Sequence, residues 1–240
     1  WSSGNFKYFL ARFLFKLNIK YVTAFIVQTE VMRDALESSY PEIAGRVNVI
    51  PQPVPTWLLQ SNLRRRARID CAADRLRLIY PAASYPHKNH KILAGLSDED
   101  SNLIYRLDLT LDPTLNPAPE FSFINCVGFL SSNGMLKAYS EVDAILFLSK
   151  KESYGFPLVE AMYVGLPIIC PELSFARTLC GDQAIYFDPD SADSLRSALS
   201  VLIKRLQAGW WPNWSERLRL FPENWEAVAQ NMLNVIPDSN

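Results

Sequence analysis

Residues 76–206 alternate short apolar runs with segments of helical periodicity, and this alternation constrains the fold more than any other feature. Within each apolar run, apolar and polar residues do not alternate strictly. We therefore expect strands that are covered on both faces. We predict strands at 76–80, 103–107, 123–127, 143–148, 167–170 and 184–187, and helices at 88–96, 132–140, 157–164, 173–179 and 191–206. This order is typical of a parallel, doubly wound α/β sheet, whose ligands bind at the carboxyl ends of the strands.

The residues before this region have the pattern of the end of another domain. We predict helices at 6–17 and 31–39 and short strands at 24–27 and 47–50. Prolines at 51, 53 and 55 exclude a central strand or helix there and indicate a stiff linker. We therefore divide the chain into three parts. Residues 1–54 are the end of an incomplete amino-terminal domain with its linker, residues 55–222 are the doubly wound domain, and residues 223–240 are a carboxyl-terminal helix.

Composition narrows the classes of partner. The 240 residues carry a net charge of −1, so global electrostatics indicate neither a nucleic-acid nor a membrane partner. The four cysteines show no Cys-x-x-Cys spacing and are typical of buried, reduced thiols in a cytosolic protein. The helix predicted at 6–17 has an apolar face and three basic residues, Lys7, Arg12 and Lys16. We favour packing of this helix in a core over contact with a membrane surface.

The segment 150–160 carries the chemistry expected at the end of a strand. It has the pattern of a loop followed by a helix that opens at Pro157, since proline suits the first helical position. Gly155 lets backbone N–H groups approach a ligand, and with the helix dipole they form an anion site that fits a diphosphate. Glu160, at the fourth helical position, is poorly placed to cap the helix and can accept hydrogen bonds from a diol. Glu152 adds a second carboxylate, although these residues alone also fit two ordinary surface glutamates.

The string SKKESYGFPLVEAMYVGLP, residues 149–167, resembles the signature of the family-4 retaining glycosyltransferases, which have the GT-B fold. That signature has two glutamates separated by seven residues, a Gly-Phe-Pro-like turn, then Glu-Ala-Met and Gly-x-Pro. Shorter stretches on both sides also resemble the family: 25–29, 49–51, 127–130, 139–143, 181–184 and 187–189. The similarity covers about residues 20–235, and it implies a GT-B protein whose first domain is incomplete here.

The resemblance assigns roles to three side chains. It implies that Glu160 holds the ribose hydroxyl groups of a nucleotide sugar and that Glu152 faces the donor sugar. Lys88, within the Pro-His-Lys-Asn-His sequence at 86–90, matches the family's basic residue on the diphosphate. Family members use no bound metal, so a departing diphosphate needs fixed positive charge as its negative charge grows. Glu152 and Lys88 are therefore the predicted catalytic residues.

The resemblance also assigns roles to two loops. The backbone N–H groups of three residues would contact the sugar or the phosphates: Gly155, Phe156 and Leu158. Three residues after the predicted strand 123–127 would lie against the nucleobase: Gly128, Phe129 and Leu130.

Two features depart from the family pattern, and a third, a pair of histidines, allows a different interpretation. The family commonly has an arginine a few residues before its lysine, and residues 80–84 contain none. Arg177 replaces part of a frequent Pro-Glu pair, and we interpret it as a surface charge. His87 and His90 could be a metal pair, but no cysteine or carboxylate cluster of ligand spacing accompanies them, so we predict no metal site.

The resemblance implies a metal-independent, retaining hexosyltransferase that moves a sugar from a GDP- or UDP-sugar to a glycan or lipid-linked acceptor. We expect no cofactor, no nucleic-acid partner, and a cytoplasmic location that allows peripheral contact with the inner face of the membrane. The Pro-His-Lys-Asn-His form favours bacterial surface-polysaccharide synthesis from GDP-mannose. Because the acceptor domain is incomplete, we expect the chain to bind the donor but to transfer slowly or not at all. The alternatives are a degenerate nucleotide-sugar-binding or scaffold module, and another GT-B enzyme such as a sugar epimerase.

Overall fold

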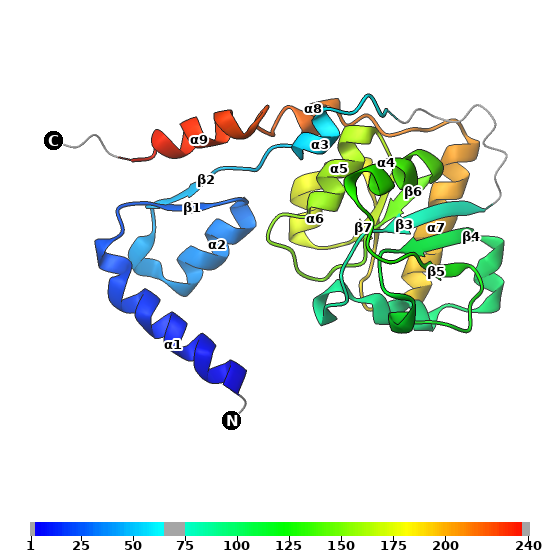
Figure 1. Ribbon diagram of the computed structural model, residues 1–240, viewed down its shortest axis with the longest axis horizontal. Coiled ribbons are helices and arrows are strands. Elements are labelled where there is room, and N and C mark those ends of the chain that lie inside the picture. The colour runs from blue at the N-terminus through cyan, green and yellow to red at the C-terminus, as the bar shows by residue number, and fades with distance from the viewer. Residues whose placement is uncertain (1–2, 65–74, 237–240) are drawn as a thin grey trace. The chain divides into compact units, whose positions relative to one another are not determined.

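The chain folds into two compact units, which are described one at a time. The computed structural model describes residues 3–64 and 75–236, so Cys71 lies outside the described residues. The smaller unit contains the residues up to Pro53 and those from Pro222 onward, and the larger unit runs from Val54 to Phe221 (Figure 1). The division between Pro53 and Val54 falls within the proline stretch at 51–55.

A sheet of six parallel strands forms the centre of the larger unit, in the order β5-β4-β3-β6-β7-β8. The strands are β3 (Leu76–Tyr80), β4 (Ile104–Leu109), β5 (Ile124–Cys126), β6 (Ala144–Leu146), β7 (Ile168–Pro171) and β8 (Ile185–Phe187). Both β6 and β7 are buried along their whole length, as strands covered on both faces require. The predicted parallel α/β sheet is confirmed.

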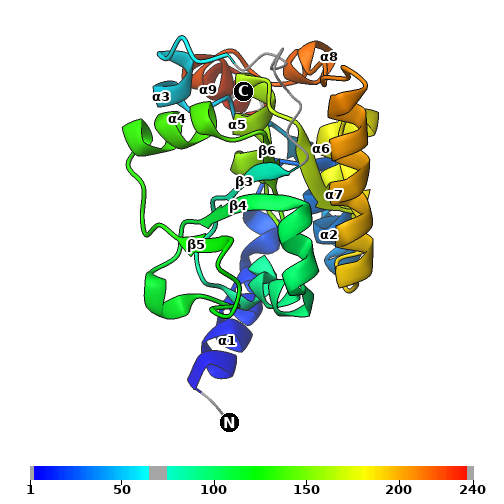
Figure 2. The same cartoon turned by 90° about the vertical axis from the view of Figure 1, so that its right-hand side faces the viewer.

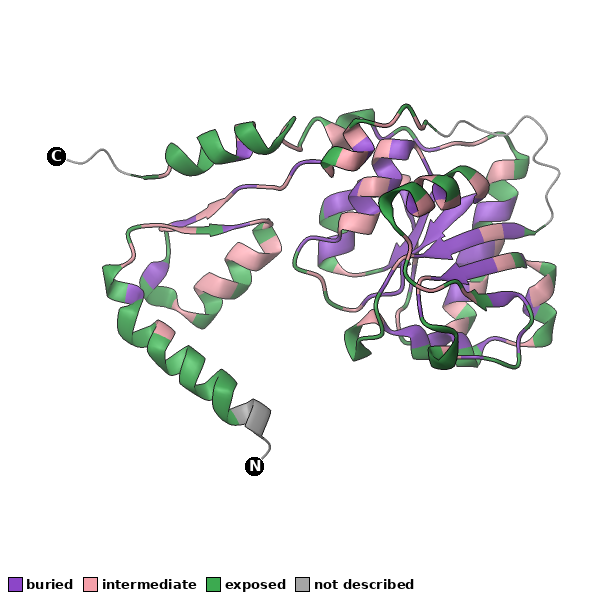
Figure 3. Ribbon diagram, in the orientation of Figure 1, coloured by how far each residue is buried: buried purple, intermediate pink, exposed green. Residues whose placement is uncertain are grey.

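Helices cover both faces of this sheet: α3 (Thr56–Leu59), α4 (Ser132–Glu141), α5 (Phe156–Val164), α6 (Ser174–Cys180), α7 (Ala192–Gln207) and α8 (Ser215–Leu218). Figure 2 shows α7 on one side of the strands and α4 on the other. The inner face of α7 repeats every three or four residues, with Leu195, Leu199 and Leu202 fully buried. Figure 3 shows that the buried residues concentrate in the strands and in the helix faces turned toward them.

One predicted helix is absent. Residues 88–96 do not form an α-helix; two short 3-10 turns, Pro86–Lys88 and His90–Gly95, flank Asn89. Asn89 has a φ of 57°, in the left-handed region where a right-handed helix cannot continue. Its side-chain amide donates to the carbonyl of Pro189 over 2.9 Å, and this bond helps hold the unusual conformation. The prediction was wrong because apolar periodicity does not reveal such a break.

The smaller unit contains α1 (Ser3–Asn18), β1 (Phe25–Val27), α2 (Glu30–Ser39), β2 (Val47–Val49) and α9 (Trp225–Leu233). Strands β1 and β2 pair in parallel. Four buried residues form their small core: Ile19, Val27, Ile43 and Val47. Thr29 caps α2, since its hydroxyl oxygen accepts a hydrogen bond from the N–H of Met32.

The apolar face of α1 is exposed. Phe6, Phe9 and Phe13 are 65%, 67% and 51% exposed, and Phe15 is the α1 residue that packs against the small core. The expectation that α1 packs in a core is therefore wrong for the described chain. None of the described helices is long and apolar enough to cross a bilayer.

Candidate functional site

The strand order creates a switch point between β3 and β6. The chain leaves β3 toward β4 and β5 on one side, and it leaves β6 toward β7 and β8 on the other. In parallel α/β sheets of this kind, a crevice for ligands forms at the carboxyl ends of the two central strands. Lys88 follows β3 and Glu152 follows β6, so the topology brings both predicted catalytic residues to this edge.

Lys88 and Glu152 form a direct ion pair. The Nζ atom of Lys88 lies 2.5 Å from Oε1 of Glu152, and the two side chains are only 16% and 11% exposed. A charge-assisted hydrogen bond in such a poorly hydrated place is stronger than the same bond in water. Two residues that are 64 positions apart in the sequence therefore form one electrostatic unit at the switch point.

The backbone around Lys88 is fixed by residues that the sequence analysis did not select. Tyr80, fully buried at the end of β3, donates its hydroxyl hydrogen to the carbonyl of Lys88 over 2.8 Å. The N–H of Lys150 donates to the carbonyl of His87 over 2.8 Å, which joins the loop after β3 to the loop after β6. Together with the bond from Asn89 to Pro189, these contacts hold the backbone from which the Lys88 side chain extends.

The helix after β6 begins one residue earlier than predicted. Gly155 is the N-cap of α5, so Phe156 is the first helical residue, Pro157 the second and Glu160 the fifth. Gly155 has a φ of 87°, and a Cβ atom there would lie 3.3 Å from Cδ1 of Leu179. Both the backbone conformation and the space therefore favour glycine at this position.

The start of α5 offers fewer donors than predicted. The N–H of Leu158 already donates to the carbonyl of Gly155 over 2.9 Å, so it is not available to a ligand. Within residues 3–64 and 75–236, the N–H groups of Gly155 and Phe156 donate to no other group of the chain. These two N–H groups lie at the positive end of the helix dipole, where a negative charge is favoured.

Glu160 lies in the second turn of α5 and is partly buried. Its Oε2 atom accepts a hydrogen bond of 2.7 Å from the hydroxyl of Tyr139, a fully buried residue of α4. Burial raises the pKa of Glu160, while the hydrogen bond from Tyr139 lowers it. The sequence analysis did not select Tyr139, because nothing in its spacing shows that it faces Glu160.

The loop predicted to contact a nucleobase follows β5, at one edge of the sheet. Gly128 has a φ of 73°, and its N–H donates to the carbonyl of Leu111 over 2.8 Å. Phe129 is 94% exposed, and its ring is free to stack on a flat ligand. Like Lys88 and Glu152, this loop follows the carboxyl end of a strand, but β4 separates β5 from β3 in the sheet.

The remaining candidates do not join this cluster. The ring of His87 stacks on Tyr85, with 5.7 Å between ring centroids. His90 is buried, and desolvation, with a smaller effect of Lys88, lowers its pKa to about 4, so the ring is neutral near pH 7. Arg177 forms an ion pair with Glu172 at the surface and lies over the ring of Tyr186, as expected of a surface charge. No group of three or more metal-binding side chains occurs among the described residues.

Comparisons with known proteins relate the chain to glycosyltransferases. Residues 123–206 match the family model described as Glycosyl transferases group 1. The resemblance to glycosyltransferases is confirmed. Among curated relatives, the O-antigen chain mannosyltransferase RfbU of Salmonella typhimurium is 23% identical over 199 residues, which are 78% of this chain and 53% of the relative. The chain thus spans about half the length of that relative.

Solved structures show the fold. The lipopolysaccharide glycosyltransferase WaaG matches 89% of this chain with a TM-score of 0.63 at 15% identity, and the match covers 62% of WaaG. The pneumococcal O-GlcNAc transferase GtfA, solved in complex with UDP and GlcNAc, matches 91% of this chain with a TM-score of 0.58 at 19% identity, and the match covers 46% of GtfA. The expected GT-B architecture is therefore confirmed, with this chain covering part of it.

Proposed function

We propose that this chain holds the donor site of a retaining glycosyltransferase, which moves a hexose from a nucleotide sugar to a glycan or lipid-linked acceptor. The observation that carries the proposal is the partly buried ion pair between Lys88 and Glu152 at the switch point of the sheet. A cation and a carboxylate at this place suit the two parts of a nucleotide sugar that meet there, the diphosphate and the sugar hydroxyl groups. The match of residues 123–206 to a glycosyltransferase family supports the same function.

Each group has a defined task in the proposed site. Lys88 and the N–H groups of Gly155 and Phe156 bind the diphosphate, and their fixed charge and dipoles stabilise it as the leaving group without a bound metal. Glu152 accepts hydrogen bonds from the donor sugar, and Glu160 accepts them from the ribose. The exposed ring of Phe129 stacks on the nucleobase, a contact worth about 1 to 3 kcal/mol in comparable sites.

We propose GDP-mannose as the donor and a bacterial surface polysaccharide as the product. The Pro-His-Lys-Asn-His sequence at 86–90 favours this donor, and the relative RfbU is named an O-antigen chain mannosyltransferase. The alternative nucleobase of the donor is uracil, since GtfA was solved in complex with UDP. This chain spans about half the length of RfbU, and transfer needs donor and acceptor held together. We therefore propose that the chain binds the donor and transfers slowly or not at all.

Calorimetric titration with GDP, UDP, ADP and the matching nucleosides tests the donor site. We expect one diphosphate to bind with a Kd below about 1 mM. Glu160→Ala should weaken that binding by about 1 to 3 kcal/mol, because ribose hydroxyl groups lose their acceptor. Lys88→Ala should reduce the preference for the diphosphate over the nucleoside. Glu99→Ala, which removes an exposed carboxylate near the start of β4, is the control and should change nothing.

Three other results would point elsewhere. If none of the three diphosphates binds, the donor site is absent and the chain is a degenerate module. If a nucleotide sugar binds but its sugar is converted to an epimer, the protein is a sugar epimerase. If sugar is transferred with inverted anomeric configuration, as NMR of the product would show, the retaining mechanism is wrong.

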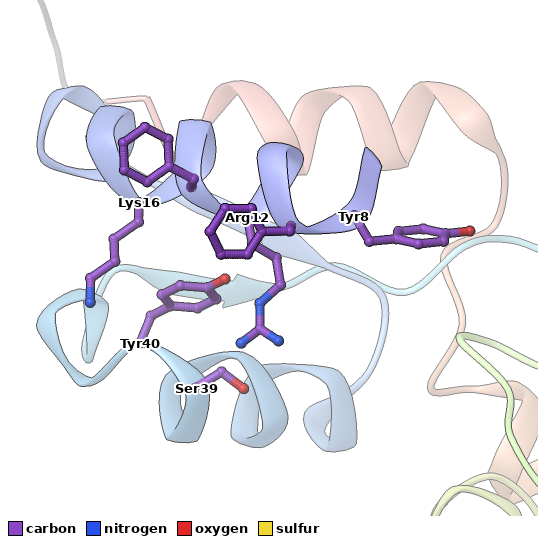
Figure 4. Close-up of a pocket in the computed structure, with 7 residues that line it drawn as sticks. Tyr8, Arg12, Lys16, Ser39 and Tyr40 are labelled. Atoms are coloured by element: carbon purple, nitrogen blue, oxygen red, sulfur yellow. The ribbon is translucent and has the colours of Figure 1, made fainter. Parts of the chain in front are cut away.

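We also propose that α1 contacts an anionic membrane surface, at the cytoplasmic face. Its exposed aromatic face lies beside Lys7, Arg12 and Lys16, and none of the three has an acidic partner among the described residues. Figure 4 shows Arg12 and Lys16 extending from α1 toward Tyr40 across a hollow of about 520 Å³. An amphipathic helix of this composition lies in the interface plane and binds anionic lipids.

Vesicle flotation tests this contact. The protein should float with vesicles that contain phosphatidylglycerol and stay behind with pure phosphatidylcholine. Arg12→Glu together with Lys16→Glu should abolish flotation, whereas Glu30→Ala on α2 should not. Equal flotation with both lipids would show that charge does not direct the contact.

A further inference from the structure

Tyr139 joins two helices through a carboxylate. It lies on α4 with no exposed surface, and its hydroxyl donates to Oε2 of Glu160, in the second turn of α5, over 2.7 Å. A buried hydroxyl group needs a partner, and this one has a carboxylate at the proposed donor site. Because Oε2 accepts this bond, Oε1 is the oxygen with both lone pairs available to a ligand.

The charged groups on neighbouring elements are engaged elsewhere. Arg177, on α6, forms an ion pair with Glu172. On α4, the Nζ atom of Lys137 lies 4.0 Å from Oε1 of Glu141. On α8, the guanidinium group of Arg217 donates to the carbonyls of Leu179 and Thr178. In the part of the chain that the structure describes, no cation pairs with Glu160, so the hydroxyl of Tyr139 is the group there that stabilises its ionised form.

We propose that Tyr139 is the positioning residue for Glu160: its hydroxyl holds one carboxylate oxygen in place and keeps the group ionised, so that the carboxylate can accept both vicinal hydroxyl groups of a ribose. The inference rests on the proposed function, since it assigns the supporting residue of that same site.

The chemistry of the carboxyl group explains why the hydroxyl matters. A carboxylate offers only acceptors, whereas in a protonated carboxyl group one oxygen becomes a hydroxyl that must donate, and the remaining acceptor is uncharged and forms weaker hydrogen bonds. Burial raises the pKa of Glu160, and removal of the Tyr139 hydrogen bond would raise it further. Ribose binding then requires a higher pH, because the ionised form that binds is lost as the pH falls through this pKa. Tyr139→Phe keeps the ring in the core and removes only the hydroxyl.

The test compares a ribonucleoside diphosphate with its 2′,3′-dideoxy analogue, on the wild-type chain and on Tyr139→Phe, from about pH 5.5 to about pH 9. We expect Tyr139→Phe to bind the ribonucleotide about tenfold more weakly than the wild type does, and this difference should be larger at the lower end of the pH range than at the upper end. The dideoxy analogue should bind equally to both proteins at every pH. Glu160→Gln should lose the preference for ribose at all pH values.

A second measurement does not depend on the ligand. NMR of isotope-labelled glutamate carboxyl carbons should show a higher pKa for Glu160 in Tyr139→Phe than in the wild type. Tyr186→Phe is the matched control, because it removes a hydroxyl that donates to the carbonyl of Gly181, and it should leave Glu160 unchanged.

The outcomes separate the role of Tyr139 from the proposed donor site. If Tyr139→Phe weakens both nucleotides equally, or if the pKa of Glu160 does not rise, Tyr139 does not act through Glu160 and the inference is wrong. If the wild type binds the dideoxy analogue as tightly as the ribonucleotide, the diphosphate site stands and the ribose contact is refuted. If it binds neither, the proposed function fails, and the role of Tyr139 fails with it.

Discussion

The ion pair between Lys88 and Glu152 gives the sharpest test of the site. Lys88→Met removes the charge and keeps most of the apolar stem, and it leaves the carboxylate of Glu152 without its partner at 11% exposure. Breaking a buried pair in this way costs about 3 to 5 kcal/mol of stability. Because both side chains retain some contact with water, we expect a loss of about 3 kcal/mol. Lys88→Met combined with Glu152→Leu removes both charges and should recover most of that loss.

Urea denaturation of the wild type, both single variants and the double variant gives the coupling energy. Lys150→Met is the control: Lys150 pairs with Asp190 near the same edge of the sheet, but those side chains are 28% and 76% exposed. An exposed pair contributes about 0 to 1 kcal/mol, so this variant should lose far less stability than Lys88→Met. Titration of the same proteins with a nucleoside and its diphosphate measures the contribution of Lys88 to phosphate binding.

Two results would refute this reasoning. If Lys88→Met loses no more stability than Lys150→Met, Lys88 and Glu152 do not form a partly buried ion pair in solution. If the double variant still prefers the diphosphate to the nucleoside as strongly as the wild type, Lys88 does not bind the phosphates.

Three further predictions follow from local geometry. Gly155→Ala should lose about 1 to 2 kcal/mol in thermal unfolding and weaken diphosphate binding, since alanine is strained at a φ of 87°. Tyr80→Phe should lose about 1 kcal/mol and weaken the diphosphate but not the nucleoside, because the carbonyl of Lys88 loses its donor. The pKa of His90 is lowered to about 4, so the unfolded chain binds its proton more readily, and stability should fall as the pH drops from about 6.5 to about 4. A His90→Gln variant should lose that part of the pH dependence.

The sequence predicted the sheet well because each strand has its own signal. The runs at β3 and β6 are apolar and too short for a helix, so their length indicates strands. The alternation of strands and helices predicts a parallel sheet, whereas the order of the strands and the switch point between β3 and β6 come from the structure. Lys88 and Glu152 were predicted from a motif, and the topology explains why they meet.

Other parts of the site depend on contacts between distant segments. Nothing near Tyr139 in the sequence indicates that it faces Glu160, and nothing near Tyr80 indicates a bond to the carbonyl of Lys88. The start of α5 was predicted at Pro157, but the left-handed Gly155 caps the helix and moves its start to Phe156. The periodicity of apolar residues locates a helix, whereas the position of its cap depends on a backbone conformation that cannot be read from the sequence.

The pairing of Lys88 with Glu152 also predicts how the donor sugar contributes to affinity. A diphosphate carries more negative charge than one carboxylate, so a bound diphosphate competes with Glu152 for the ammonium group of Lys88. The carboxylate then needs other donors, and the hydroxyl groups of an attached sugar supply them, whereas a free nucleoside diphosphate cannot. In the proposed site, a nucleotide sugar should therefore bind more tightly than the matching nucleoside diphosphate in calorimetric titration. Glu152→Gln should reduce that difference, because the neutral amide forms weaker hydrogen bonds with the sugar. An unchanged difference in this variant would show that Glu152 does not face the sugar.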